Sequence, residues 1–214
     1  MANIQGVKDA LASHEAENVH YHVRTATVVV AAYDSKYKQF ADFVSSGGND
    51  ASLINGAINA LPENGGKIVL LDGTYNISTT LQILRRNIWL AGCGVNTILK
   101  VSSDFRPEGF HMMVSDMVID FDGDNSKLNI IYGNSQILTR LTIKNSTGVN
   151  VLSADNITVD NCKFENNSTH LRINGSNTLI ANCRFCGYRD WETDRKSTRL
   201  NSSHSAKSRM PSSA

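Results

Sequence analysis

A 21-residue repeat in the second half of the chain limits the folds that are open to it. Similar segments begin at Leu138, Val159 and Ile180, so the interval is 21 residues both times. A further segment, beginning at Val114, fits the same pattern 24 residues before Leu138. A fixed period of this length is the signature of a solenoid, because one coil cannot bury its own apolar face whereas stacked coils share a continuous core.

Aligned at this interval, the repeated segments share three columns of apolar residues. Side chains on one face of a strand recur at every second position, so we expect the columns to point into a common interior. Parallel strands stacked at about 4.8 Å would make each column continuous through the fold. The columns are Val114, Leu138, Val159, Ile180; then Met117, Leu141, Cys162, Cys183; then Ile119, Ile143, Phe164, Phe185.

Two kinds of solenoid fit the pattern apolar-x-x-apolar-x-apolar-x-x-Asn. A leucine-rich repeat needs leucines on its return segment as well, and usually a helix there. Here the return segments 148–152 and 170–173 have the composition of strands, and the columns hold Cys, Phe, Met and Val where that repeat requires Leu. The absence of a helical period in the repeats therefore favours an all-β fold, a parallel β-helix.

Asparagine supports a chain with many turns. There are 22 asparagines, and 12 of them fall between Asn125 and Asn182. Asparagine tolerates left-handed backbone and favours turns over helix interiors. In register, Asn156 lies over Asn177 and Asn161 lies over Asn182, so we expect amide ladders or turns at the corners of the coils.

The first half of the chain predicts one short helix among strands. After Asp50, a good N-cap residue, apolar residues follow at helical spacing to residue 61, and Pro62 comes next. We therefore expect a capping helix over about 50–61. We expect a turn at 72–75. Strands are expected at 23–32, 67–71, 77–83, 87–92 and 97–101.

Three segments follow from this pattern. Residues 1–22 are polar and read as a linker or an attachment segment, in which His14, His20 and His22 are ordinary surface residues. Residues 23–188 form the β-helix. Residues 189–214 lack apolar periodicity, and the stretches DRKSTRLNSSH and SRMPSSA resemble the translation of a sequencing adapter. We interpret 189–214 as a non-native or disordered tail and the β-helix as C-terminally truncated.

Charge and hydropathy exclude several classes of partner. The formal net charge is +1, which gives no reason to expect nucleic-acid binding. No run of 18 apolar residues is present, so we expect no membrane span, and the N-terminus lacks a secretory signal pattern. Four cysteines are too few for a disulfide scaffold.

Charged residues are predicted to form ladders on an outer face. If residues 117 and 119 point inward, Asp116 and Asp120 point outward. In register, Asp116 lies over Arg140, and Asp120 lies over Lys144, which in turn lies over Glu165. One interpretation is a solvated row of ion pairs. The other is a saccharide-facing groove in which acid and base come from neighbouring coils, so these four residues are catalytic candidates.

Asp122 is the fifth candidate. It lies two residues from Asp120, a separation of about 6.5–7 Å along a strand, which would suit the carboxylate pair of an inverting glycosidase. The run from Asp120 to Asn125 also resembles a calcium loop, but an EF-hand needs Glu at position 12, where this chain has Ile131. A turn explains Asp122 equally well. We expect no cofactor and no metal, with Ca²⁺ as the lesser alternative.

Two further motifs have structural explanations. The sequence from Gly92 to Thr97 matches G-x-G-x-x-T, but a strand follows it where a dinucleotide site needs a helix. Cys162 and Cys183 are expected to stack inward as free thiols, although their separation would permit a disulfide. Cys183 and Cys186 form a lone CxxC whose thiols alternate to opposite faces, which argues against zinc.

Residues 49–101 closely resemble the N-terminal region of the pectate-lyase-like, right-handed parallel β-helix superfamily. The resemblance rests on the acid and helix from Asp50 to Leu61, the run NGGKIVLLDGTY at 64–75, and the turn from Gly92 to Thr97. It continues through the repeats to about Tyr188. The superfamily contains polysaccharide lyases, glycoside hydrolases, epimerases and bacteriophage tail-spike or tail-fibre proteins, so the resemblance is specific for the fold and not for the chemistry.

Two functions are compatible with this resemblance. The first is a phage tail-spike or tail-fibre-like surface protein that engages bacterial polysaccharide. It would be located in the virion or outside the cell, with a homotrimer and contacts to other virion proteins as the expected assembly. The alternative is a secreted polysaccharide lyase or glycoside hydrolase whose catalytic coils are missing or incomplete. The lack of a signal sequence favours the first.

Overall fold

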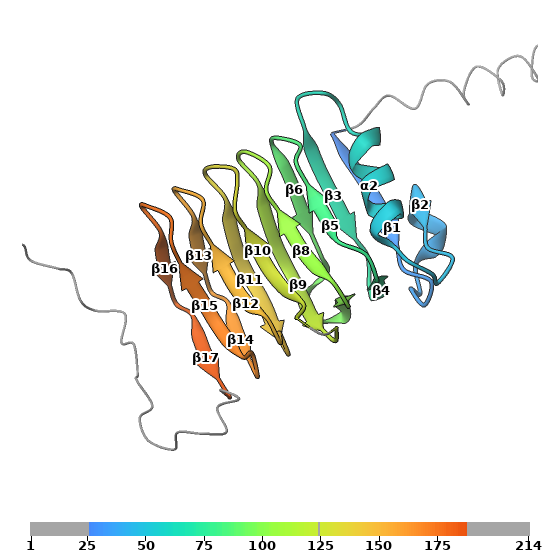
Figure 1. Cartoon of the computed structure of the whole chain (residues 1–214). Helices are drawn as coiled ribbons and strands as arrows, with labels where there is room; N and C mark the ends of the chain where they lie inside the picture. Colours follow the sequence, from blue (N-terminus) through green and yellow to red (C-terminus); the bar gives the residue numbers. More distant parts are fainter. Residues whose placement is uncertain (1–25, 124, 188–214) are drawn as a thin grey trace, which may run out of the picture.

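The computed structural model describes residues 26–123 and 125–187, which form one stack of coils (Figure 1). A coil here is one turn of the solenoid. Successive coils lie side by side from the blue N-terminal end to the red C-terminal end, and the helix α2 (Ala51–Ala60) lies at the N-terminal end. Every strand pairing in the described residues is parallel. This confirms the predicted all-β parallel β-helix with one short helix. The predictions for 1–22 and 189–214 concern residues outside the described part.

The strands form three columns, which give the solenoid three faces. The first face contains β2 (Phe43–Val44), β1 (Thr27–Ala31), β3 (Gly66–Leu70), β6 (Ile88–Ala91), β9 (Met113–Phe121), β11 (Ile137–Lys144), β13 (Thr158–Asp160) and β16 (Leu179–Ala181). The second contains β4 (Gly73–Ile77), β7 (Thr97–Val101), the C-terminal halves of β9 and β11, β14 (Lys163–Glu165) and β17 (Arg184–Cys186). The third contains β5 (Leu81–Ile83), β8 (Asp104–Pro107), β10 (Lys127–Ile130), β12 (Val149–Leu152) and β15 (Thr169–Ile173).

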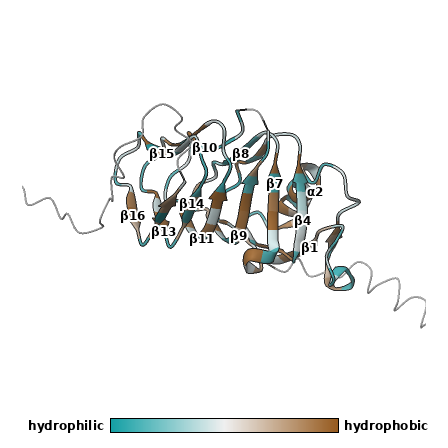
Figure 2. Ribbon diagram, turned by 90° about the horizontal axis from the view of Figure 1, so that it is seen from below, coloured by the Kyte–Doolittle hydropathy of each residue, from teal (hydrophilic) through white to brown (hydrophobic). Residues whose placement is uncertain are grey.

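The three apolar columns of the repeat line the interior, as predicted. Leu138 pairs with Val114 on one side and with Val159 on the other. Ile143 pairs in the same way with Ile119 and Phe164. The residues of the central coils are almost fully buried, and Figure 2 shows hydrophobic colour along β7, β9 and β11 with hydrophilic colour at many of the turns. Burial of these side chains is the main stabilising term of the stack.

Left-handed backbone marks the corners of the coils. Non-glycine residues with positive φ recur once per coil at equivalent places, and asparagine occupies most of them because it tolerates this conformation. One corner column is Asn87, His111, Ser135, Asn156, Asn177, and another is Asp116, Arg140, Asn161, Asn182. This confirms that the asparagines serve as corner residues.

Ladders and corner turns were the two alternatives for the stacked asparagines, and one of the two pairs also forms a ladder. The Asn177 side chain donates from Nδ2 to Asn156 Oδ1 over 3.2 Å. Asn161 and Asn182 follow the corner alternative, and Asn182 Nδ2 donates to Asp160 Oδ1 over 2.9 Å. At this corner the asparagines contribute their backbone conformation, and the Asp160 carboxylate on β13 accepts the hydrogen bond from the Asn182 amide.

The helix α2 closes the N-terminal end with the face that the sequence predicts. Ala51, Ile54, Ala57 and Ile58 are buried against the core, and Leu61 follows them. Asp50 stands at the N-cap position, but its carboxylate makes no hydrogen bond to the helix. It accepts instead from the Ser45 hydroxyl and from the backbone N–H of Asn76, so Asp50 holds the predicted N-cap position but its side chain ties the helix to its neighbours.

The turn predicted at 72–75 is also wrong, because β4 begins at Gly73 and pairs with β7 along its whole length. Tyr75 is fully buried there, and its hydroxyl donates to the backbone oxygen of Val30 over 2.8 Å. The strand expected over 77–83 is divided by a corner between β4 and β5. The strand expected at 97–101 is β7, so Gly92 to Thr97 leads into a strand and not into a helix that could present its N-terminus to phosphate.

Candidate functional site

Asp116 and Arg140 form an ion pair at the corner between the first and second faces. Both have left-handed backbone, with φ of 61° and 52°, which aims their side chains outward beside each other. The Arg140 guanidinium donates from both Nε and Nη2, and the Nη2 bond to Asp116 Oδ2 is 2.8 Å. The hydrogen bonds from Arg140 lower the pKa of the Asp116 carboxyl, so Asp116 is held in the ionised form.

Asp120 and Lys144 form the second pair, in the predicted register. They are partners on β9 and β11, and Lys144 Nζ lies 3.0 Å from Asp120 Oδ2. The other carboxylate oxygen accepts from Asn145 Nδ2 over 2.7 Å. Lys144 is in turn the strand partner of Glu165 on β14. The predicted register on the second face is therefore present, but the Glu165 carboxylate is ion-paired with Lys163 of its own strand.

Asp122 lies apart from this strand face. β9 ends at Phe121, so Asp122 falls in the turn that follows, as the turn interpretation requires. Lys100 Nζ lies 3.2 Å from Asp122 Oδ2, and the Ser102 hydroxyl donates to Asp122 Oδ1 over 2.7 Å. Asp120 and Asp122 are thus bound to different lysines.

This arrangement limits what the five candidates can do chemically. Each of the three carboxylates is paired with a cation, and the lowered pKa of Asp116 removes that carboxyl as a proton donor near neutral pH. The two basic partners among the candidates, Arg140 and Lys144, are occupied by the same contacts. The side chains remain partly exposed, so the pairs are screened and each stabilises the fold by about 0–1 kcal/mol.

The cysteines and acidic groups form no metal centre. Within residues 26–123 and 125–187, no group of three or more His, Cys, Asp or Glu side chains could hold a metal ion. Asp124, part of the calcium-loop hypothesis, lies outside the described residues, so Ca²⁺ stays a sequence-based alternative. Cys162 and Cys183 are free thiols on adjacent coils; Cys162 is fully buried and Cys183 partly so. A hydrogen bond from Cys162 lowers the pKa of Cys183 to about 7, whereas the same contact and burial raise that of Cys162.

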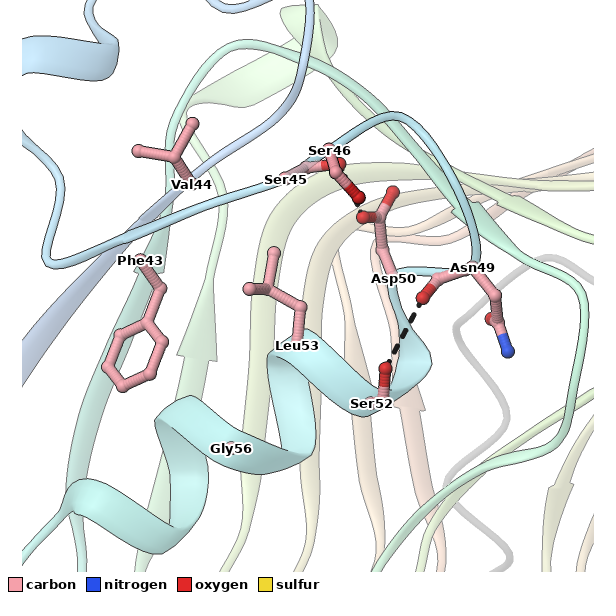
Figure 3. A pocket seen from close by; sticks show the side chains of 9 residues that line it. All are labelled: Phe43, Val44, Ser45, Ser46, Asn49, Asp50, Ser52, Leu53 and Gly56. Carbon is pink, nitrogen blue, oxygen red and sulfur yellow. Dashed lines mark hydrogen bonds between the residues drawn. The ribbon is translucent and has the colours of Figure 1, made fainter.

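A pocket of about 340 Å³ lies between α2 and β2 (Figure 3). Phe43 and Val44 line it from β2, and Leu53 faces them from the helix. Its polar side is built from Asp50 and Ser45, which are hydrogen-bonded to each other over 2.5 Å. Because these polar groups already satisfy one another, we assign the pocket to the attachment of the helix and not to a ligand.

Two adjoining hollows on the outside of the stack were not predicted. One is lined by Arg86, Asn87, Phe110 and His111, and the other by Asn87, Ile88, Trp89, His111 and Met113. The sequence places these residues in two segments about 24 positions apart, so only the register of the coils brings them together. One sequence signal for an exposed aromatic residue was available. Trp89 stands between Ile88 and Leu90, so strand alternation places it on the outer face.

The helices of the described residues do not span a membrane. None is both long and apolar enough to do so, and α2 has only ten residues.

Comparison with known proteins identifies a family for most of the chain. A family model described as "Rhamnogalacturonase A/epimerase, pectate lyase-like" matches residues 46–201, more than half of the 214 residues. No curated protein matches the chain. Among solved structures it is similar to ORF18 of Geobacillus virus E2, with a TM-score of 0.45 and 18% identity over 86% of this chain. The match covers 46% of that structure, so this chain spans less than half of its length.

Proposed function

Because the chain belongs to the pectate-lyase-like rhamnogalacturonase A/epimerase family, we propose that it is a β-helix surface protein that binds polysaccharide. The support for this proposal is the family membership together with the form of the outer surface. Three faces of parallel strands present rows of side chains at a regular spacing of about 4.8 Å, which suits an extended polymer. The tail-spike setting in a virion, and assembly as a homotrimer, are further parts of the proposal that rest on the superfamily resemblance.

One observation favours binding over cleavage by the described coils. Each of the carboxylates Asp116, Asp120 and Asp122 is bound to its own cation. A glycoside hydrolase needs one protonated and one ionised carboxyl group across the scissile bond. A lyase needs a basic group that is free to take a proton. The three carboxylates and the bases Arg140 and Lys144 are instead held in ion pairs, whereas binding requires only shape and fixed polar groups.

Affinity gel electrophoresis of the full chain tests this function. Native gels would be cast with acidic polysaccharides (pectate, alginate, hyaluronan) and with neutral ones (galactan, starch). We expect at least one polysaccharide to retard the folded chain in proportion to its concentration, and heat-denatured protein to show no such shift. Unchanged mobility of the folded chain in every gel would contradict the proposed function.

A further inference from the structure

The two hollows outside β6 and β9 adjoin each other across neighbouring coils, and we refer to them together as the depression. The larger has a volume of about 520 Å³ and the smaller about 250 Å³, and both are lined by Asn87 and His111. The larger volume lies within the range of about 300–1,000 Å³ that is usual for sites of small ligands. The depression follows the corner that leads from the third face into the first.

The corner that carries the depression is held in a fixed conformation. Asn87 and His111 occupy equivalent corner positions, with φ of 56° and 54°. The backbone N–H of Asn87 donates to the Phe110 oxygen over 2.8 Å, which joins the two coils at this point. Gly65, on the preceding coil, has no room for a side chain, because a Cβ there would come within 2.3 Å of the Asn87 oxygen. The lining residues are therefore presented by packed backbone.

Trp89 supplies a rigid aromatic wall. Its side chain projects outward from β6 and its exposed fraction is 37%. The indole Nε1 donates to the Ser115 hydroxyl on β9 over 2.8 Å, which fixes the ring across two strands. Lys67 Nζ lies 3.8 Å from the ring centre, so a positive charge is held against the same side chain.

Phe110 and Arg86 supply a second apolar surface and a free cation. Phe110 is 54% exposed, so much of its apolar surface faces solvent. Within the described part of the chain, the Arg86 guanidinium makes no hydrogen bond and no ion pair, and neither does the His111 imidazole. Among the described residues, no carboxylate lines either hollow. The depression thus combines aromatic surface, uncommitted donors and positive charge.

From this combination we propose that the depression binds an anionic sugar unit of a polysaccharide. The C–H faces of a pyranose ring pack on the rings of Trp89 and Phe110, which bury apolar surface at little entropic cost. The carboxylate of the sugar is bound by Arg86, whose planar guanidinium matches a carboxylate in bidentate geometry. The inference rests on the proposed function and adds to it a location and a class of ligand.

Intrinsic fluorescence gives a direct reading of this site. The chain contains two tryptophans, Trp89 and Trp191, so Trp191→Phe leaves Trp89 as the single indole. In this background we would titrate tetramers of galacturonate, mannuronate and hyaluronan, and neutral tetramers of galactose and glucose. We expect at least one acidic tetramer to change the Trp89 emission, with at least tenfold tighter binding than any neutral tetramer.

Matched variants of the full chain separate this site from other binding surfaces. Trp89→Ala and Phe110→Ala should each weaken retention in the affinity gels at least tenfold, and Trp89→Phe should recover part of it. Arg86→Gln should abolish the preference for acidic over neutral ligands. The controls are Phe40→Ala and Arg172→Gln, which remove an exposed ring and an exposed guanidinium elsewhere and should leave binding unchanged. Circular dichroism confirms that each variant is folded.

The outcomes distinguish this inference from the proposed function. If the wild-type chain binds polysaccharide but Trp89→Ala and Phe110→Ala bind equally well, the location is wrong and the proposed function stands. Retention by neutral polysaccharides alone, or an Arg86→Gln variant with unchanged preference, overturns the anionic class of ligand. If no polysaccharide is bound by the wild-type chain, the proposed function fails and this inference fails with it.

Discussion

At the scale of single residues, the ion pair of Asp116 and Arg140 occupies a corner that other coils build with asparagine. Asn161 and Asn182 adopt the same left-handed backbone on the next two coils. For a long side chain such as arginine this conformation costs about 1–2 kcal/mol relative to ordinary backbone. The guanidinium offsets part of that cost by binding Asp116 through two hydrogen bonds. The pair therefore places fixed charges on the surface at a corner where asparagine would adopt the backbone conformation at lower cost.

Arg140→Ala should lower the free energy of unfolding by about 0.2–1 kcal/mol at pH 7, the usual range for an exposed pair. The folded chain lowers the pKa of Asp116 below its unfolded value of about 3.9, so the contribution is present above pH 4. It is lost as the pH falls through the lower folded value. Urea unfolding of both proteins at pH 7, 4 and 2.5 should show the difference shrinking toward acid.

Arg140→Asn is the matched variant, because it removes the guanidinium but keeps a residue that tolerates left-handed backbone. We expect it to be more stable than Arg140→Ala at every pH and to show less acid sensitivity than the wild-type chain. A difference between wild type and Arg140→Ala that stays constant down to pH 2.5 would show that Asp116 does not contribute through its charge.

At the scale of elements, the helix α2 depends on an arginine from a later coil. Arg85 lies in the loop between β5 and β6, and its guanidinium donates to the backbone oxygens of Ile58, Leu61 and Pro62. The first two are carbonyls at the C-terminal end of the helix; Ile58 also accepts from the Leu61 backbone N–H, whereas Arg85 supplies the donor for Leu61. A cation also interacts favourably with the negative end of the helix dipole. One side chain thus joins the capping helix to the stack.

Arg85→Met should destabilise the chain by about 1–3 kcal/mol, because it removes the donor of the Leu61 carbonyl, whereas the Ile58 and Pro62 carbonyls keep the backbone donors Leu61 N–H and Gly65 N–H. The neighbouring Arg86→Met is the control, since Arg86 is exposed and makes no such bonds within the described residues. Chemical unfolding followed by far-ultraviolet circular dichroism measures both. Equal stability of the two variants would mean that water replaces the Arg85 contacts without loss.

The sequence predicts the parts of the fold that depend on spacing. The three apolar columns and the buried face of α2 follow from periods of 21 residues and of 3.6 residues, and both are confirmed. The role of Asp50 was missed because its partner Asn76 lies 26 positions away on another element. The turn expected at 72–75 was wrong because Gly and Asp resemble a turn locally, whereas pairing with β7 extends the strand. The depression beside Trp89 could not be predicted, because its residues come from two coils and only the register brings them together.

At the scale of the whole molecule, the ion-paired side chains and the Arg86 guanidinium lie on different parts of the stack. On the second face, Asp120 and Asp122 are each neutralised by a lysine from an adjacent coil. At the opposite end of the first face, Arg86 makes no ion pair within the described residues, and Phe110 and Trp89 are exposed there, the latter with Lys67 over its ring. Ion-paired ladders keep strands in register, whereas uncommitted groups remain free for a ligand. The surface chemistry therefore favours recognition at the corner and stability along the face.

We accordingly expect the chain to bind polysaccharide without cleaving it. Lyase activity would require a free base, commonly Arg or Lys, against an acidic sugar, and hydrolase activity would require two carboxyl groups in different protonation states. The candidates Asp116, Asp120, Arg140 and Lys144 are committed to one another. Incubation with pectate, alginate and capsular extracts should give neither an ultraviolet-absorbing unsaturated product nor new reducing ends.

The control for this prediction is the chain with the ladder removed. Asp120→Ala and Arg140→Ala should leave the assays at the same background as the wild-type chain, because no turnover is present to lose. Product formed by the wild-type chain and abolished by either substitution would contradict the prediction and assign catalysis to the second face. Product that survives both substitutions would place an active site elsewhere in the chain, and the corner beside Trp89 would be the first place to test, since its cation and imidazole are not held in ion pairs within the described residues.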